Sequence, residues 1–259
     1  MLTRNYHTHT TRCKHAMGTE REYIEEAIRN GYKVLGFSDH VPQPFPEGYV
    51  SSIRMDMGQM DEYIETLLKL REEYKDRIRL LIGFEVEFFP KYFEKLMNEL
   101  DKRPDIDYLI LGQHSVEDEV EGVYSGSPTT DVGVLSKYVD LCLTGLKTGR
   151  FFYLAHPDLI YFTGENPAYE YEMSRLIEYC VSEKVPLEFN VQGFEYGRNY
   201  PDERFFKLAS KAGAEVILGI DAHRPGQLIQ PEEIEGFSDF SDRCGIRYSS
   251  LDLPINPEV

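Results

Sequence analysis

Short apolar runs alternate along the chain with longer segments in which apolar residues recur every three or four positions. The short runs have the length of buried parallel strands, and the longer segments have the period of amphipathic helices. The runs predict strands at residues 4–8, 34–38, 79–88, 108–112, 151–155, 187–191 and 215–220. Because a helical segment separates successive strands, the order predicts parallel pairing with right-handed crossovers.

The first helix is predicted from a capping signal. Thr19 is followed three positions later by Glu22, the spacing of a capping box, and Gly31 ends the apolar stripe. The same periodicity predicts helices at residues 58–75, 92–100, 135–146, 173–179 and 205–211. Residues 41–54 contain three prolines and a glycine and predict a long irregular loop. Residues 221–259 show no clear repeat, and we expect this tail to wrap around the outside.

These elements amount to seven strand–helix units without an internal break in composition. They predict the α/β class, with a distorted (β/α)7 barrel that resembles a TIM barrel and occupies residues 1–259 as one domain. No linker, repeat or low-complexity segment divides the chain. In such a barrel the carboxyl ends of all strands face one mouth, where functional side chains gather.

The formal net charge is −17, and 41% of the residues are hydrophobic. A surface of this charge repels polyanions, so we expect no stable binding to nucleic acid. A small phosphate ester is not excluded, because cations bound in a site can dominate its local field.

Cysteine usage and apolar patterning bear on the compartment. The four cysteines are scattered without a Cys-x-x-Cys pair, which is typical of a reducing environment. The N-terminus has no apolar core of a signal peptide, and no apolar stretch is long enough to span a bilayer. We therefore expect a cytoplasmic protein without a membrane partner; its oligomeric state is left open.

The histidines are placed unusually for a chain that has seven of them. His7 and His9 stand at the end of the first predicted strand, and His15 follows in a loop. The others close, or directly follow, one predicted strand each: His40, His114, His156 and His223. Their recurrence at the ends of successive strands predicts that all seven imidazoles converge at the mouth of the barrel.

Acidic residues stand among them. Side chains alternate along a strand, so His7 and His9 share a face, as do Asp221 and His223. Glu85 and Glu87 share a face at the end of the third predicted strand, and Glu85 is closer to the barrel. Cys13 lies between His9 and His15, but a site of imidazoles and carboxylates does not require it, and we interpret it as a packing residue.

Seven imidazoles and two carboxylates are too many ligands for one ion. At about four ligands per ion, with one carboxylate bridging, they suit three divalent ions of zinc, manganese or iron. The candidate ligands are His7, His9, His15, His40, Glu85, His114, His156, Asp221 and His223. We expect the nucleophile to be a hydroxide that bridges two ions held by Glu85 and Asp221, since no catalytic side chain is evident.

This ordered set resembles the PHP (polymerase and histidinol phosphatase) family over essentially the whole chain. Residues 13–18, 36–42, 188–190, 200–201 and 221–225 are similar to its histidinol-phosphatase branch. The resemblance implies a (β/α)7 barrel with three ions. The first would be held by His7, His9, Glu85 and Asp221, the second by Glu85, His114 and His156, and the third by His15, His40 and His223.

The chain departs from the family pattern around the expected substrate. Ile220 stands where the family usually has Ser, and Phe194 and Glu195 follow a turn after which many members carry a cation. The nearest cation is Arg198, which is our candidate for a phosphate or substrate clamp, although a surface arginine fits equally well. Glu117 is a candidate partner for a substrate ammonium, with a solvated charge run at residues 117–121 as the alternative.

The function implied is a metal-dependent phosphomonoesterase, a histidinol-phosphatase that converts L-histidinol phosphate and water to L-histidinol and phosphate in histidine biosynthesis. A PHP phosphoesterase for another small phosphate ester or a nucleotide is the main alternative. Nucleic-acid processing is disfavoured because the chain lacks a basic track for a backbone. A metal-binding module without catalysis would show closed coordination with no position open to water.

Overall fold

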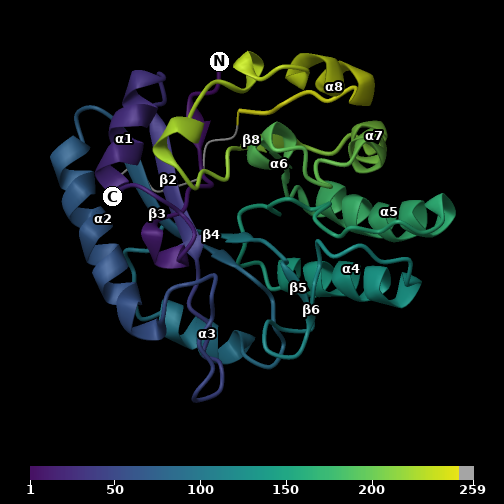
Figure 1. Cartoon of the computed structure of the whole chain (residues 1–259), viewed down its shortest axis with the longest axis horizontal. Coiled ribbons are helices and arrows are strands. Elements are labelled where there is room, and N and C mark those ends of the chain that lie inside the picture. The colour runs from purple at the N-terminus through teal and green to yellow at the C-terminus, as the bar shows by residue number, and fades with distance from the viewer. Residues whose placement is uncertain (251–259) are drawn as a thin grey trace.

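The computed structural model describes residues 1–250 (Figure 1). Parallel pairing joins seven segments, here called staves, into a closed ring; six of them are strands and one is a single bridging residue. Leu154 is the fifth stave and pairs in parallel with Leu111 and Leu187, while a parallel bridge between Thr8 and Ala222 joins the last stave to the first. The other six staves are β1 (Arg4–Asn5), β2 (Val34–His40), β3 (Arg79–Val86), β4 (Tyr108–Leu111), β7 (Leu187–Asn190) and β8 (Val216–Gly219). The expected distorted (β/α)7 barrel is confirmed.

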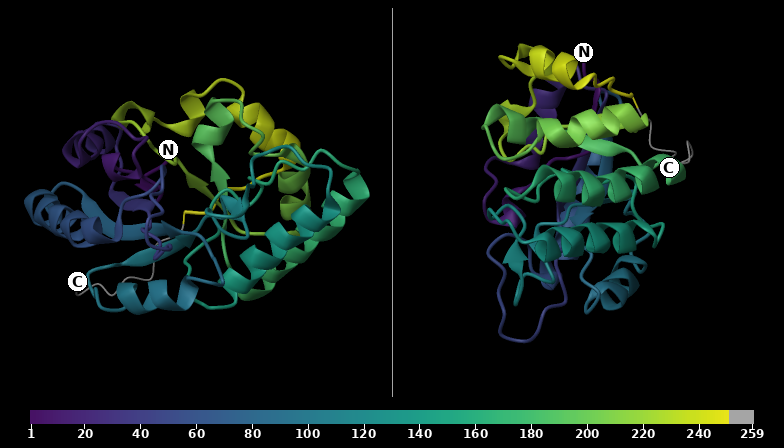
Figure 2. Two further views of the ribbon diagram at one scale, coloured as in Figure 1. Left: turned by 60° about the horizontal axis from the view of Figure 1, so that its bottom comes forward. Right: turned by 90° about the vertical axis from the view of Figure 1, so that its right-hand side faces the viewer.

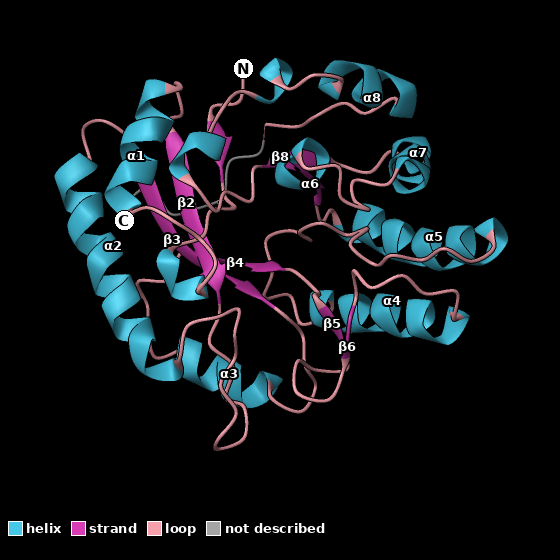
Figure 3. Ribbon diagram, in the orientation of Figure 1, coloured by secondary structure: helices cyan, strands magenta, loops and turns pink. Residues whose placement is uncertain are grey.

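The barrel is uneven, and this is the sense in which it is distorted. The longest strands are β2 and β3, whereas the staves from β4 round to β8 are short (Figure 3). The strand predicted at residues 151–155 is reduced to one residue, Leu154, with a bridge on each side. Pairing between β2 and β3 sets His40 directly beside Glu85, so the register of two long strands already brings two candidate ligands together.

The helices lie outside the ring. α1, α2 and α3 flank the long strands, and α4, α5, α7 and α8 stack one above another on the other side (Figure 2). The capping box of the first helix is confirmed, because Thr19 accepts from the Glu22 backbone and the Glu22 carboxylate accepts from the Thr19 backbone at 2.7 Å. The bounds are α1 (Glu20–Arg29), α2 (Met60–Tyr74), α3 (Phe93–Leu100), α4 (Val132–Leu146), α5 (Asn166–Glu183), α6 (Val191–Glu195), α7 (Glu203–Ala212) and α8 (Phe237–Cys244).

Some elements were not predicted. A small hairpin, β5 (Ser115–Val116) and β6 (Val123–Tyr124), lies between the strand predicted at 108–112 and the helix predicted at 135–146. α6 is a short helix capped by Asn190. The tail holds α8, whereas its pattern indicated no regular element; residues 251–259 of that tail lie outside the described residues. The irregular loop was predicted correctly, since residues 41–56 contain neither helix nor strand.

The interior of the barrel is a packed floor beneath the mouth. It is filled by a cluster of buried side chains separate from the core under the helices: Tyr6, Val34, Leu81, Tyr108, Ile110, Tyr153, Ala155 and Ile217. The Tyr108 hydroxyl donates to the backbone oxygen of Tyr6 at 2.6 Å. A β-carbon at Gly36 would lie 2.2 Å from that hydroxyl, so a glycine is needed there to admit the ring. The packed interior leaves no room for a ligand, so functional side chains can gather only above it, at the carboxyl ends of the staves.

No helix among residues 1–250 combines the length and the apolar character needed to cross a membrane.

Candidate metal centre

The nine candidate ligands lie together at the carboxyl ends of the staves. Each imidazole has another imidazole as a neighbour. Ring centroids are 4.1 to 5.2 Å apart for the pairs His7–His9, His9–His223, His9–His40, His40–His114, His114–His156 and His15–His223. Residues from both ends of the chain thus share one site.

Backbone pairing between the first and last staves positions the amino-terminal histidines. The His9 amide donates to the Ala222 oxygen at 2.9 Å, and the Ala222 amide donates to the His7 oxygen at 3.2 Å. The side chains of His7 and His9 are fully buried. Because they alternate with Thr8 along extended backbone, both rings enter the barrel mouth.

One group has the dimensions of a four-ligand site. His7 Nε2 lies 3.6 Å from Glu85 Oε2 and 3.5 Å from Asp221 Oδ1. His9 Nε2 lies 3.6 and 3.1 Å from the same two oxygens. Ligands about 2.1 Å from a tetrahedral ion are about 3.4 Å from one another. The four separations between an imidazole and a carboxylate are therefore compatible with a shared ion, and His7, His9 and Glu85 form one compact group of ligand atoms.

The same four atoms provide a test of fit that does not depend on the distances. His7 Nε2, His9 Nε2, Glu85 Oε2 and Asp221 Oδ1 are buried and have no hydrogen-bond partner among residues 1–250. Buried polar atoms are ordinarily partnered, and leaving several together without a partner is costly. A bound cation would satisfy all four.

Glu85 extends the cluster in a second direction. Its other oxygen, Oε1, lies 2.7 Å from His156 Nε2 and 3.5 Å from His114 Nε2. Burial alone would raise the pKa of Glu85, but the charges of His114, His40 and His7 outweigh burial and hold it well below its usual range. An ionised carboxylate with imidazoles on both oxygens is arranged to bridge two cations.

A third group lies nearer the solvent. His15 Nε2 and His223 Nε2 are 2.9 Å apart, and one ring nitrogen of His40 lies within 4.8 Å of both residues' ligand atoms. Two imidazole nitrogens facing each other at this distance are not a stable pair when both are charged. A shared cation is a natural occupant.

Carboxylates behind the imidazoles fix the orientation of the rings. Glu188 accepts from His7 Nδ1 at 2.8 Å, Asp39 lies 3.4 Å from His9 Nδ1, and Glu87 lies 3.4 Å from His114 Nδ1. Such contacts set which ring nitrogen faces the ion. The sequence places Glu87 on the same face as Glu85, and residue 188 in a stretch similar to the family, but neither pattern predicts these contacts. Alternation with Asn190 in β7 is the available signal for Glu188.

Two candidate ligands have unusual backbone conformations. The φ angle is +57° at Asp221 and +28° at His156, in the region that residues with a β-carbon rarely occupy. Such conformations persist only where surrounding structure enforces them, and they cluster at functional sites. Each residue lies two positions after the last paired residue of its stave, Gly219 for Asp221 and Leu154 for His156.

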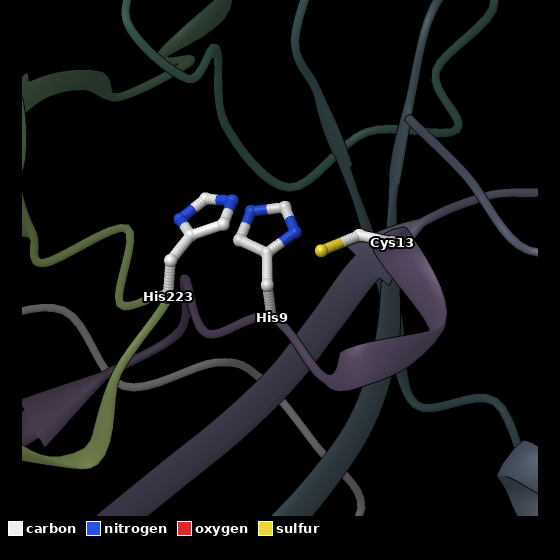
Figure 4. Close-up of side chains that lie close together, drawn as sticks. All are labelled: His9, Cys13 and His223. Atoms are coloured by element: carbon white, nitrogen blue, oxygen red, sulfur yellow. The ribbon is translucent and has the colours of Figure 1, made fainter. Parts of the chain in front are cut away.

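Cys13 lies beside this centre. Figure 4 shows its sulfur directed toward the His9 ring, with the His223 ring beyond, and one ligand atom of each of the three residues lies within 4.8 Å of the others. Burial alone would raise the pKa of the Cys13 thiol, but hydrogen bonds with His15, His223 and His9 lower it to about 5. The side chain is fully buried, and its sulfur belongs to a group that could hold a metal ion, so the interpretation of Cys13 as a packing residue stays a prediction.

A cavity of about 490 Å³ opens above the centre. Arg198 lines it, with its Nη1 3.4 Å from the Tyr200 hydroxyl. Glu117 lies elsewhere, since it is exposed, pairs with Lys137 of α4, and is not among the residues that line the cavity. The lining comprises His15, His40, Ile53, His114, Tyr124, Gln192, Tyr196, Arg198, Tyr200, Asp221, His223, Arg224 and Gln227.

Comparison with known proteins adds to this geometry. Residues 5–192 match the PHP domain family. A Deinococcus radiodurans protein named "Probable histidinol-phosphatase" is 30% identical over 232 residues, which cover 86% of this chain and 86% of that protein. The histidinol-phosphatase of Bacillus subtilis is 29% identical over 276 residues, which cover 94% of this chain and all of that protein.

A solved structure has the same fold. Histidinol phosphate phosphatase from Lactococcus lactis, complexed with zinc, L-histidinol and phosphate, matches with a TM-score of 0.72 and 18% identity. The match covers 95% of each chain. The barrel architecture is therefore shared along nearly the full length.

Proposed function

The chain belongs to the PHP domain family, and from this premise we propose that it is a histidinol-phosphatase: it hydrolyses L-histidinol phosphate to L-histidinol and phosphate in histidine biosynthesis. The observation that carries the proposal is the convergence of seven imidazoles and two carboxylates beneath an open cavity. Two similar proteins bear the name histidinol-phosphatase, and a protein of the same fold binds zinc, L-histidinol and phosphate.

We infer that the resident cofactor is three divalent ions of the zinc, manganese or iron class. His7, His9, Glu85 and Asp221 would hold the first, Glu85 with His114 and His156 the second, and His15, His40 and His223 the third. Such ions polarise phosphate oxygens and make bound water acidic enough to react near neutral pH. The open cavity leaves room for substrate above the ligands, which favours catalysis over a closed, purely structural metal site.

The chain's own residues would bind and orient the ester. Arg198 presents a guanidinium at the cavity wall beside the Tyr200 ring, at 6.0 Å from the ring centroid, and we propose that it contacts the phosphate or the leaving group. Contact between Glu117 and a substrate ammonium stays a prediction, with less support because that carboxylate pairs with Lys137.

Replacing Arg198 with Met is expected to raise KM for histidinol phosphate by roughly 10- to 100-fold, because a hydrogen bond to a charged group contributes about 1.5–3 kcal/mol. Steady-state phosphate release measures it. Arg243→Met is the matched control, since Arg243 also lies over an aromatic ring, that of Phe240, but is not among the cavity residues. A KM unchanged by Arg198→Met would remove Arg198 from the substrate site.

The substrate assignment is tested with a panel: histidinol phosphate, sugar phosphates, nucleotides and single-stranded DNA, each with divalent metal supplied. We expect kcat/KM for histidinol phosphate to exceed every other value by at least about tenfold, a difference of roughly 1.4 kcal/mol. A smaller preference would favour the alternative, a PHP phosphoesterase for another small ester or a nucleotide. The net charge of −17 supports our expectation that DNA is not a substrate.

We propose that the protein acts in the cytoplasm. The four cysteines are all free and buried, and this supports a compartment in which thiols stay reduced.

A further inference from the structure

Arg54 is a fully buried cation that none of the chemistry above uses. It lies in the irregular loop of residues 41–56, between β2 and α2, and only 1% of its side chain is exposed. A buried guanidinium is costly to desolvate unless every part of it is paired. The groups that pair with the Arg54 guanidinium therefore indicate its role.

The guanidinium joins three segments. Nε donates to Glu119 Oε2 at 2.6 Å, Nη1 donates to the Val41 oxygen at 3.1 Å, and Nη2 forms an ion pair with Glu87. Glu119 belongs to the connection between β5 and β6, and Glu87 lies just beyond the end of β3. One side chain thus ties two rim loops to the end of a central strand.

Glu87 carries the connection to the candidate metal centre. It is also buried, with 1% of its side chain exposed, and its Oε1 accepts from the His114 backbone amide at 3.0 Å. The same oxygen lies 3.4 Å from His114 Nδ1, while His114 Nε2 faces Glu85 Oε1 at 3.5 Å. Arg54, Glu87 and His114 therefore form a continuous polar chain that ends at the bridging carboxylate.

The pairing of Arg54 with Glu87 explains how two charged side chains can be buried, because each is the partner of the other. Glu87 Oε1 holds His114 through the backbone amide and lies 3.4 Å from Nδ1, an atom without a hydrogen-bond partner among the described residues. The other ring nitrogen, Nε2, is therefore the one directed at Glu85. The loop that carries Arg54 also supplies Ile53 to the cavity wall, so the same pairing sets part of the mouth.

We propose that Arg54 is a positioning residue for one ion of the centre, holding Glu87 so that Glu87 fixes the His114 ring toward the ion shared with Glu85. The inference rests on the metal-dependent part of the proposed function. It assigns no contact between Arg54 and substrate. Its consequence is selective: the ion bound by His114 depends on Arg54, whereas the ions held by the other ligands do not.

The test measures metal retention on the full chain, with Zn²⁺ as the only added ion. Wild type, Arg54→Met, Arg54→Lys and Glu87→Gln are loaded, dialysed against graded chelator, and analysed for zinc per chain by mass spectrometry. We expect Arg54→Met and Glu87→Gln to release one equivalent at about 10- to 100-fold lower chelator concentration than wild type, with the remaining zinc unaffected. Arg54→Lys should restore part of the difference, because the charge is kept and the fork geometry is lost.

A matched control distinguishes a role of Arg54 in metal binding from a role in stability alone. Arg71 pairs with Asp107, which is 7% exposed and precedes β4 at the opposite end of the barrel. Arg71→Met should lower the melting temperature of the metal-free protein and retain zinc like wild type. If Arg54→Met and Glu87→Gln lower that temperature yet release zinc only at the wild-type chelator concentration, the proposal is wrong.

Two further outcomes are informative. If Arg54→Met does not fold, Arg54→Lys decides the question, and zinc release from it at the wild-type chelator concentration would contradict the proposal. Glu87→Gln then tests only the contact between Glu87 and His114, because Arg54 still pairs with Glu119 in that variant. Since no substrate is used, failure to hydrolyse histidinol phosphate does not affect the result. A wild-type chain that holds no zinc would instead overturn the metal-dependent function, before any variant is compared.

Discussion

Replacing Asp221 with Asn is expected to lower phosphate release by at least roughly 10³-fold, because the loss of several kcal/mol of charge stabilisation corresponds to three powers of ten. Asp221 Oδ1 lies 3.1 Å from His9 Nε2 and 3.5 Å from His7 Nε2, and it has no hydrogen-bond partner among the described residues. An amide removes the negative charge that a cation between these atoms requires.

The variant should fold, which makes the result interpretable. Asp221 has a φ of +57°, and Asn tolerates this region as readily as Asp. Asp221 Oδ2 accepts from Asn190 Nδ2 at 3.0 Å, and an amide oxygen can accept the same bond. Circular dichroism and thermal unfolding check the fold, and phosphate release is measured on histidinol phosphate and p-nitrophenyl phosphate. Asp107→Asn, at the opposite end of the barrel, is the control; full activity in Asp221→Asn would place the site elsewhere.

The framework of this site could be predicted because its signals are local in sequence. Each apolar run that ends in an imidazole marks both a strand and a position at the mouth, as in β2 with His40. The long parallel pair β2–β3 follows the predicted runs closely. The partition of ligands into three groups required the family resemblance, since spacing along the chain does not say which atoms face one another.

Other elements depend on contacts that the sequence does not display. The fifth stave consists only of bridges from Leu154 to Leu111 and Leu187, because the short strands there meet at a single residue. α8 was missed since it has only eight residues in a proline-containing tail, and its Phe237 and Phe240 pack on Phe189 from β7. Tertiary packing, more than helix propensity, determines such a short helix.

The residues behind the ligands were the hardest to foresee. Arg54 lies 33 positions from Glu87 and 65 from Glu119, in a loop whose path is set by the fold and not by a repeating pattern. A lone arginine in a segment with three prolines is usually read as exposed. Only the folded path of residues 41–56 shows that Arg54 is buried against the carboxylates of Glu87 and Glu119.

Gly112→Ala is expected to lower phosphate release by about 10²- to 10³-fold, although glycine 112 carries no functional group. A β-carbon at this position would lie 1.9 Å from Glu85 Oε1 and 2.7 Å from its carboxyl carbon, which no real contact permits. Glu85 is 1% exposed and has imidazoles on both oxygens, so it cannot turn away without leaving the centre. The absence of a side chain at Gly112 therefore leaves the space that the Glu85 carboxylate occupies.

The added methyl displaces the carboxylate more readily than it unfolds the barrel. Overpacking by one methyl group costs typically about 1–3 kcal/mol, less than the stability of most domains, whereas a metal site tolerates little displacement of a shared ligand. Gly112→Ala should therefore unfold cooperatively, bind fewer zinc ions than wild type, and show the activity loss. Gly226→Ala is the control near the cavity, because a β-carbon there meets nothing within 4 Å. A Gly112→Ala protein with wild-type zinc content and turnover would mean that Glu85 does not hold cations from this position.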